Sequence, residues 1–407
     1  MSTKLRLAAL QFFQNAIFAC SVISIGTYLS QTLGFSGREV GMVYATNALA
    51  ATLMPPVIGW LADRHFSADR MLVWLNVVAG AALAGSYFAT GFWSFYALIL
   101  VFNLAFIPTF SLLSSICFHQ LPNPEKDFPL VRFWGTVSFM FIGVGLSYFG
   151  VETSPLPLLA GTVCCLAMAG FALTLPPVPP QPGFDLKVLT GPETRKILRE
   201  PGMMILLIAM LVSCVPSSFY YSFVNLFLNE IGWSAAAAKM SLGQLVELGL
   251  FLTLPWFFHK LRFRRIVFWG LLLWGLRYFA FAVARPGELE WLLYAGIVVQ
   301  GFVFVWVVIA GQIYVDNRVP VALRSTAQGL VSFANQGLGI FIGSWLAGEI
   351  VLAGSLPDGG HDWFRIWLVP GAVGVLGALL FWWFFPRTGK LAGPSAGSGG
   401  AAAAGAK

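Results

Sequence analysis

Long apolar blocks separated by short polar links run through almost the whole chain. Segments such as 203–215 and 302–309 are hydrophobic almost throughout rather than at a period of two or 3.6 residues. A helix that is apolar on all sides is surrounded by other helices or by lipid, and about 20 such residues cross a hydrocarbon core of about 30 Å. The pattern therefore predicts an all-α membrane protein.

Windows of sufficient length predict twelve transmembrane helices. They cover residues 5–33, 38–62, 70–91, 93–119, 129–149, 155–176, 203–228, 238–259, 265–284, 289–315, 323–351 and 364–385. A proline-rich cytoplasmic linker over 177–202 divides them into two six-helix bundles, 1–176 and 203–386. The Gly, Ala and Ser residues of 387–407 have too little apolar bulk to fold, which predicts a disordered tail.

Composition and charge support this reading. The chain is 58% hydrophobic and 10% charged, whereas soluble domains are about 45–50% apolar and about 25% charged. Lys and Arg are retained on the cytoplasmic side of a membrane, and most of the 24 fall there if both termini are cytoplasmic. The net charge of +7 is then a topology signal, so we expect no nucleic-acid partner. The five Cys fall inside spans without metal spacing, so we expect no metal site.

The sequences of the two halves of the chain are weakly similar. The triplet at 137–139 (Val-Ser-Phe) recurs at 331–333, in the equivalent half of the chain. Membrane carriers are often built from internal repeats, with the substrate site at the repeat interface near mid-membrane. The layout predicts a transporter that alternates access around a central site.

The link between the second and third spans carries a recognisable motif. Its residues Gly-Trp-Leu-Ala-Asp-Arg at 59–64, followed by Ser-Ala-Asp-Arg at 67–70, resemble the cytoplasmic signature of the major facilitator superfamily. The resemblance implies two pseudo-symmetric six-helix bundles and a cytoplasmic gate that includes Asp63, Arg64 and Arg70. The alternative to a gate is an ordinary loop between two spans, in which Asp and Arg are present only because the loop is exposed to water.

A narrower resemblance covers nearly the whole chain. Segments 41–63, 127–136, 244–247, 274–277 and 322–329 are similar to the nucleoside:proton symporter family of bacterial permeases, although 132–136 is also similar to phenylpropionate permeases. This family implies a proton-coupled nucleoside transporter of the bacterial inner membrane, with substrate, protons and lipid as partners. We expect a monomer with no cofactor.

Two charged residues, Glu247 and Arg277, fall deep inside predicted spans. A charged side chain at the bilayer centre costs roughly 2.5–3.5 kcal/mol on insertion scales, so such residues normally face a cavity or a partner. Gln244 lies three residues before Glu247, on the same helix face. In the family these two positions bind substrate, and Glu247 is also the expected proton carrier. The alternatives are a neutral Glu247 bonded to a neighbouring helix, and an Arg277 that is either the charge partner of Glu247 or a structural tie.

A stripe of span 129–149 holds Arg132, Thr136 and Phe139 at i, i+4 and i+7. The resemblance implies that Arg132 and Thr136 hydrogen bond with a nucleoside and that Phe139 stacks on its base. Arg132 lies only one turn inside the span, so the alternative is that it snorkels toward the interface.

Further candidates lie on two spans of the second half. Ser218, Tyr221 and Asn225 share one face of span 203–228, and Gln300 and Phe304 lie four apart in span 289–315. The family has amides at the first two positions and an aromatic residue where Gln300 stands, so this chain departs from the pattern there.

One departure concerns coupling. The family has an aspartate where this chain has Val305, and valine carries no proton, so Glu247 becomes the default carrier. Other functions stay open: transport of aromatic acids, whose carboxylate Arg132 would pair, transport of sugars, or a ligand sensor that moves nothing. An enzyme is not expected, because the sequence shows no base paired with a nucleophile or metal ligands.

Overall fold

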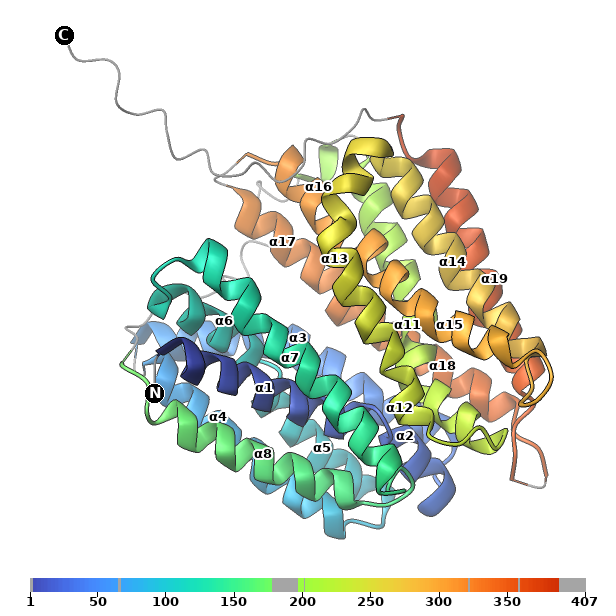
Figure 1. The fold of residues 1–407 in the computed structure, drawn as a ribbon, viewed down its shortest axis with the longest axis horizontal. Coiled ribbons are helices and arrows are strands. Elements are labelled where there is room, and N and C mark those ends of the chain that lie inside the picture. The colour runs from blue at the N-terminus through green and yellow to red at the C-terminus, as the bar shows by residue number, and fades with distance from the viewer. Residues whose placement is uncertain are drawn as a thin grey trace.

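The computed structural model describes residues 3–64, 67–177, 197–200, 202–320, 323–357 and 359–387. Its helices form two bundles that diverge from a common end, like the arms of a V (Figure 1). The N-terminal bundle consists of α1 (Thr3–Val22), α2 (Ile25–Thr27), η1 (Tyr28–Thr32), α3 (Gly37–Arg64), α4 (Ala68–Phe88), α5 (Phe92–Phe106), α6 (Thr109–Gln120), α7 (Pro124–Tyr148) and α8 (Leu156–Ala172).

The C-terminal bundle begins after the 177–202 segment. It consists of α11 (Met203–Glu230), α12 (Ala236–Met240), α13 (Leu242–Lys260), α14 (Phe263–Val283), α15 (Glu290–Val303), η2 (Phe304–Ile309), α16 (Ala310–Arg318), α17 (Arg324–Ser332), η4 (Phe333–Gly339), α18 (Ile340–Ala353) and α19 (Trp363–Phe384). Helices lie over each of the twelve predicted spans, and nine helical segments among the described residues are long and apolar enough to cross a membrane. The all-α membrane prediction is confirmed.

Several predicted spans are interrupted. The first breaks at Ser24, and the fourth bends at Pro108 between α5 and α6, where proline removes a backbone donor. Wider π-helical turns occur at η2 and η4, a geometry found frequently at functional sites. The helix over the fifth predicted span is α7, which begins at Pro124 rather than at 129 and contains Pro129 in its second turn.

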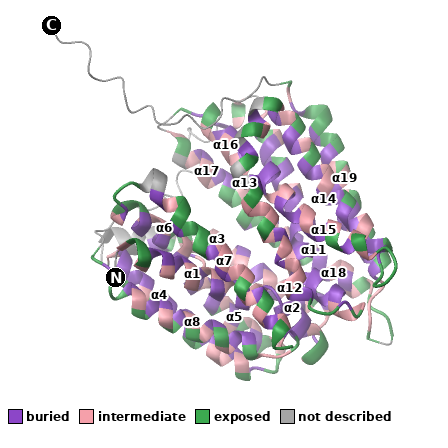
Figure 2. Ribbon diagram, viewed as in Figure 1, coloured by how far each residue is buried: buried purple, intermediate pink, exposed green. Residues whose placement is uncertain are grey.

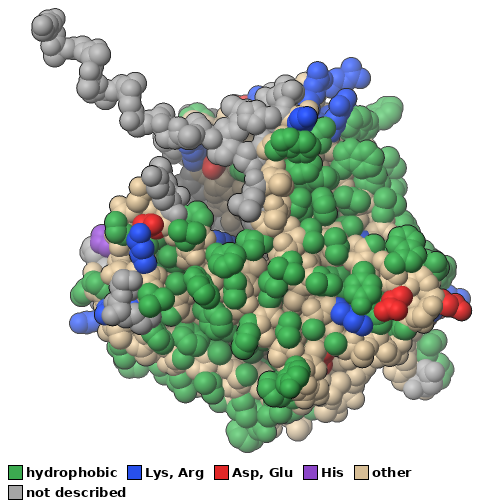
Figure 3. Space-filling view, viewed as in Figure 1, with side chains coloured by type: hydrophobic (Ala, Val, Ile, Leu, Met, Phe, Trp, Pro, Cys, Tyr) green, Lys and Arg blue, Asp and Glu red, His purple; other side chains and the backbone are tan. Residues whose placement is uncertain are grey.

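The outer surface is apolar, as a lipid-facing surface should be. Many large side chains are exposed, among them Trp74, Phe88, Trp93, Phe141 and Trp383. Exposed residues lie along the outer faces of both bundles (Figure 2), and hydrophobic side chains cover most of the visible face (Figure 3). Lys and Arg gather instead at the ends of helices, for example Arg262, Arg264 and Arg265 around a surface pocket.

The bundles touch at one end, which we call the closed end. There α2 contacts α11, α3 contacts α18, and α7 contacts α12. A Cβ on Gly26 would lie 2.3 Å from the carbonyl oxygen of Ser222, and one on Gly41 would lie 2.6 Å from that of Ser344. These helices approach so closely that only glycine fits at the crossings.

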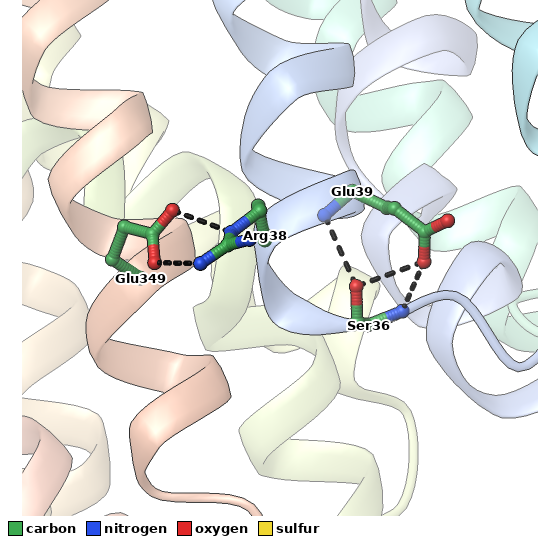
Figure 4. Close-up of polar contacts among 4 residues, drawn as sticks. All are labelled: Ser36, Arg38, Glu39 and Glu349. Carbon is green, nitrogen blue, oxygen red and sulfur yellow. Dashed lines mark hydrogen bonds and ion pairs between the residues drawn. The ribbon is translucent and has the colours of Figure 1, made fainter.

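An ion pair also joins the bundles at the closed end. Arg38, in the first turn of α3, donates from Nε and Nη2 to the two carboxylate oxygens of Glu349 in α18, at 2.6 and 2.8 Å (Figure 4). The neighbouring Glu39 bonds to Ser36 within its own bundle. Toward the other end, which we call the open end, the space-filling view shows a hollow between the bundles (Figure 3).

Candidate substrate site between the bundles

A small cavity of about 10 Å³ lies between the two bundles next to the closed end. Val22, Ile23 and Phe139 line it from the N-terminal bundle, and Tyr220, Tyr221, Ala237, Met240 and Gln244 line it from the C-terminal bundle. Three of these, Phe139, Tyr221 and Gln244, are residues that the sequence nominates for substrate binding. The cavity therefore combines aromatic faces from both bundles with one amide side chain.

Glycine contacts place the polar face of α13 against α15. A Cβ on Gly243 would lie 2.9 Å from the carbonyl oxygen of Ile297, and one on Gly301 would lie 2.5 Å from the backbone nitrogen of Glu247. The two helices therefore pack backbone to backbone. This packing brings Gln244 and Glu247 of α13 close to Gln300 of α15.

Gln300 is the centre of a buried polar network. Its Oε1 accepts a hydrogen bond from Arg277, and its Nε2 lies 3.3 Å from the hydroxyl oxygen of Tyr221. Arg277 also donates to the Tyr278 hydroxyl at 3.0 Å and lies over the ring of Tyr220, 4.4 Å from its centroid. Gln300 and Arg277 are only 1% and 2% exposed. The network thus holds two of the aromatic walls of the cavity, Tyr220 and Tyr221, in place.

The charge that acts on Glu247 comes from the opposite bundle. Arg132, on α7, is the cation that interacts electrostatically with the Glu247 carboxylate. Arg277 was expected to be either the charge partner of Glu247 or a structural tie, and among the described residues no ion pair within 4.0 Å joins it to Glu247. Its guanidinium is turned instead toward Gln300 and Tyr278. Arg132 is exposed and Glu247 is half-buried, and the two lie on helices of opposite bundles, α7 and α13.

The other nominated residues lie around this centre. Thr136 and Phe304 are half-buried. Ser218 is 2% exposed and lies at the crossing of α11 with α18, where a Cβ on Gly343 would lie 2.5 Å from its Oγ. Asn225 is bonded to Thr27 of the other bundle at 2.5 Å, so its side chain belongs to the closed end in this state. Val305 is fully buried.

The predicted gate is described only in part. α3 continues to Arg64, so Asp63 and Arg64 belong to its last turn, but their side chains lie outside the described residues. Arg70 is exposed in the first turn of α4.

Sequence reasoning missed Tyr220, Tyr278 and the acidic residues Glu152 and Glu349. The two tyrosines contact Arg277, yet tyrosine in an apolar helix gives no separate signal. Glu152 lies between the spans predicted at 129–149 and 155–176, where an acidic residue normally meets water. Of these four residues, Glu349 alone gave a signal in the sequence, because it lies inside the span predicted at 323–351, where an acidic residue is unusual.

Two helical bundles around a central cavity, closed at one end and hollow at the other, define a secondary transporter. The model of the Nucleoside H+ symporter family matches residues 1–390, so the chain belongs to this family. The resemblance seen in the sequence is confirmed. The chain is a multi-pass membrane transporter and not an enzyme.

Similar proteins agree with this assignment. The chain is 32% identical to the putative nucleoside transporter YegT and 30% identical to xanthosine permease, both of Escherichia coli strain K12; the matches cover 95% of this chain and 94% and 96% of those proteins. A crystal structure of the nucleoside transporter NupG superposes with a TM-score of 0.87 at 27% identity, covering 95% of this chain and all of that one. The POT family transporter PepTSo shares the fold alone, with a TM-score of 0.72 at 14% identity over 94% of this chain and 97% of that one.

Proposed function

We propose that this chain carries nucleosides together with protons across the bacterial inner membrane, by alternating access to the cavity between the bundles. The observation that carries the proposal is the cavity lining, in which Phe139 and Tyr221 face the same space as Gln244. Aromatic faces stack on a nucleobase and an amide hydrogen bonds with polar edges. The names of YegT and xanthosine permease support the same substrate class.

The roles of the nominated residues follow from their positions. Phe139 and Tyr221 stack on the base, while Gln244 and Glu247 bond with ribose hydroxyls or the base edge. Thr136 and Arg132 contact the substrate from α7, and Phe304 packs beside it from η2. Gln300 positions Tyr221, and Ser218 and Asn225 support the wall of the cavity on α11.

Glu247 is the proposed site of the transported proton. Its carboxylate interacts electrostatically with the Arg132 guanidinium of the opposite bundle. When the bundles rock, the distance between α7 and α13 changes, so the balance between a proton and Arg132 changes with it. Binding of substrate and proton is thereby linked to the state of the transporter.

The proposed orientation places the open end in the cytoplasm with both termini. Arg262, Arg264, Arg265 and Arg318 lie at that end, as the preference of Lys and Arg for the cytoplasmic side requires. Asp63, Arg64 and Arg70 then form the gate that closes the open end in the opposite state. The chain works as a monomer, since each copy holds both bundles and a whole site.

Transport in proteoliposomes tests the proposal. Vesicles loaded with unlabelled uridine, adenosine or xanthosine should take up the labelled nucleoside faster than empty vesicles, and an inward proton gradient should drive accumulation. Glu247→Gln should lose accumulation but retain exchange, because the glutamine still hydrogen bonds but binds no proton. Glu288→Gln, at an exposed acid in the loop before α15, is the matched control and should behave like the wild type. Absence of nucleoside counterflow in the wild type would overturn the proposal.

A further inference from the structure

A buried carboxylate at the closed end has no part in the proposed substrate site. Glu152 follows α7 and is only 6% exposed. Its Oε1 accepts hydrogen bonds from the Ser147 hydroxyl at 2.6 Å and from the backbone nitrogen of Ala237 at 3.2 Å. Its Oε2 accepts from the amide nitrogens of Asn225 at 2.8 Å and Asn229 at 3.1 Å. Three of the four donors belong to the other bundle, so this one side chain joins both.

The arrangement fits an ionised carboxylate. Such a group only accepts hydrogen bonds and has about four lone-pair sites, and here four donors occupy them. Asn225 cannot reverse its amide without cost, because its Oδ1 already accepts from the Thr27 hydroxyl. The Ser147 oxygen accepts from the backbone nitrogen of Ala238 at 2.9 Å, which directs its own proton toward Glu152. A proton on Oε2 would therefore point at the amide hydrogens of Asn225 and Asn229. A proton on Oε1 would disturb the hydrogen bond from Ser147, whose oxygen also accepts from Ala238 of the other bundle.

The carboxylate of Glu152 has no ion-pair partner in the part of the chain that the structure describes. Among the described residues, none of the ion pairs within 4.0 Å includes Glu152. The titratable groups on the surrounding elements have other partners or face outward. On α11, Glu230 bonds to His361 and Trp363. On α12, Lys239 lies over the Trp233 ring, 3.7 Å from its centroid, and on α7, Tyr148 is 83% exposed. η1 carries Tyr28, and α11 carries Tyr220 and Tyr221, which line the substrate cavity. Within the described part of the chain, hydrogen bonds therefore hold the negative charge.

The Glu152 cluster adjoins the substrate cavity. Ala237 lines the cavity and also donates to Glu152, and Asn225 lies one turn after Tyr221 on α11. A Cβ on Gly143 would lie 3.0 Å from the carbonyl oxygen of Ala237, so α7 rests directly on α12. Movement of α12 away from α7 would open the cavity and break these hydrogen bonds in the same step.

We propose that Glu152 is a proton-released latch: its ionised form holds the closed end shut, and a proton taken from the solution at that end releases it. This inference rests on the proposed transport function but is separate from the proton that Glu247 carries. Glu152 is a positioning residue, because it acts on the bundles and does not touch the substrate. Glu152 thus provides an acid at the interface between the bundles, in a chain that has Val305 where the family has an aspartate.

Distances between spin labels test the latch without any substrate. The labels sit at Phe88→Cys and Leu356→Cys, two exposed positions on opposite bundles at the closed end, in a background with the five native cysteines replaced. The wild type should show a short distance at neutral pH and gain a longer one at acidic pH. Glu152→Gln imitates the protonated form, so the longer distance should dominate at both pH values, with about a tenfold or larger shift in the ratio. Asn229→Ala, which removes one donor, should shift the ratio less.

The controls separate the latch from its neighbours and from transport. Glu230→Gln changes an acid at the same end whose partners lie within one bundle, and should keep the wild-type response. A Glu152→Gln protein with the wild-type distances, or with an intact pH response, would overturn the latch. Absent nucleoside counterflow in the wild type, with the label distances behaving as described, would overturn the proposed function and leave the latch standing.

Discussion

Gly41→Ala should force the closed end open. Gly41 lies in α3 where it crosses α18 of the other bundle. A Cβ there would lie 2.6 Å from the carbonyl oxygen of Ser344 and 2.8 Å from the Cα of Gly348. Both are backbone atoms, so no side chain can rotate away, and α3 and α18 must separate to accommodate one methyl group.

The size of the effect follows from the contact distances. An ordinary contact begins at 3.4 Å, so the helices must move apart by roughly 0.8 Å. Inserting a methylene-sized group into a well-packed interface typically costs about 1–3 kcal/mol. The cost falls only on the state in which α3 and α18 touch. At 1.4 kcal/mol for each factor of ten, the ratio of open to shut forms at this end should rise about 5- to 140-fold.

The Phe88 and Leu356 spin-label pair measures this ratio directly. Gly145→Ala is the matched control, because it makes the same change in a helix of the N-terminal bundle where a Cβ would meet nothing within 4 Å. The control should keep the wild-type distance distribution. If Gly41→Ala also keeps it while remaining folded, the glycine crossing does not limit the approach of the bundles, and the reasoning is wrong.

Two further predictions concern the buried network and the ion pair. Gln300→Leu removes the hydrogen bonds to Arg277 and Tyr221, so a buried guanidinium loses a partner and the fold should be destabilised by about 2–3 kcal/mol. Thermal unfolding in detergent should show a lower midpoint than for the control Gln31→Leu, at an exposed position. Equal midpoints for the two variants would contradict the prediction. Arg38→Glu places an acid opposite Glu349 of the other bundle and should lengthen the distance between the Phe88 and Leu356 labels. The double variant Arg38→Glu with Glu349→Arg should restore the short distance. If it does not, the ion pair does not hold this end closed.

The sequence predicted the helices well because the membrane leaves few choices. A hydrocarbon core requires every backbone group to be satisfied within the segment, so a long apolar run becomes a helix. The same runs carry no information on where a helix bends. The break at Ser24 and the π-helical turns at Phe304–Ile309 and Phe333–Gly339 depend on contacts between helices, which a single span does not specify.

The site could be predicted only as far as it depends on residue type within one helix. The pairing of Gln244 with Glu247 was visible as a three-residue spacing. The partner of Arg277 was not, because Gln300 is 23 positions away on a different helix. The role of Glu152 was not visible for the same reason, since its donors Asn225, Asn229 and Ala237 lie in the other half of the chain.

The ion pair between Arg38 and Glu349 differs from the rest of the closed end in its exposure to solution, with 55% and 29% of the two side chains accessible. Dissolved salt screens such a pair, over about 8 Å at physiological ionic strength, but hardly affects the glycine crossings or the buried Glu152 cluster. In the proposed orientation the closed end faces the surrounding medium, so the salinity of that medium weakens the ion pair but leaves the glycine crossings and the Glu152 hydrogen bonds intact. A cell in brackish water and a cell in fresh water would then hold the same protein at a different resting balance between its two states.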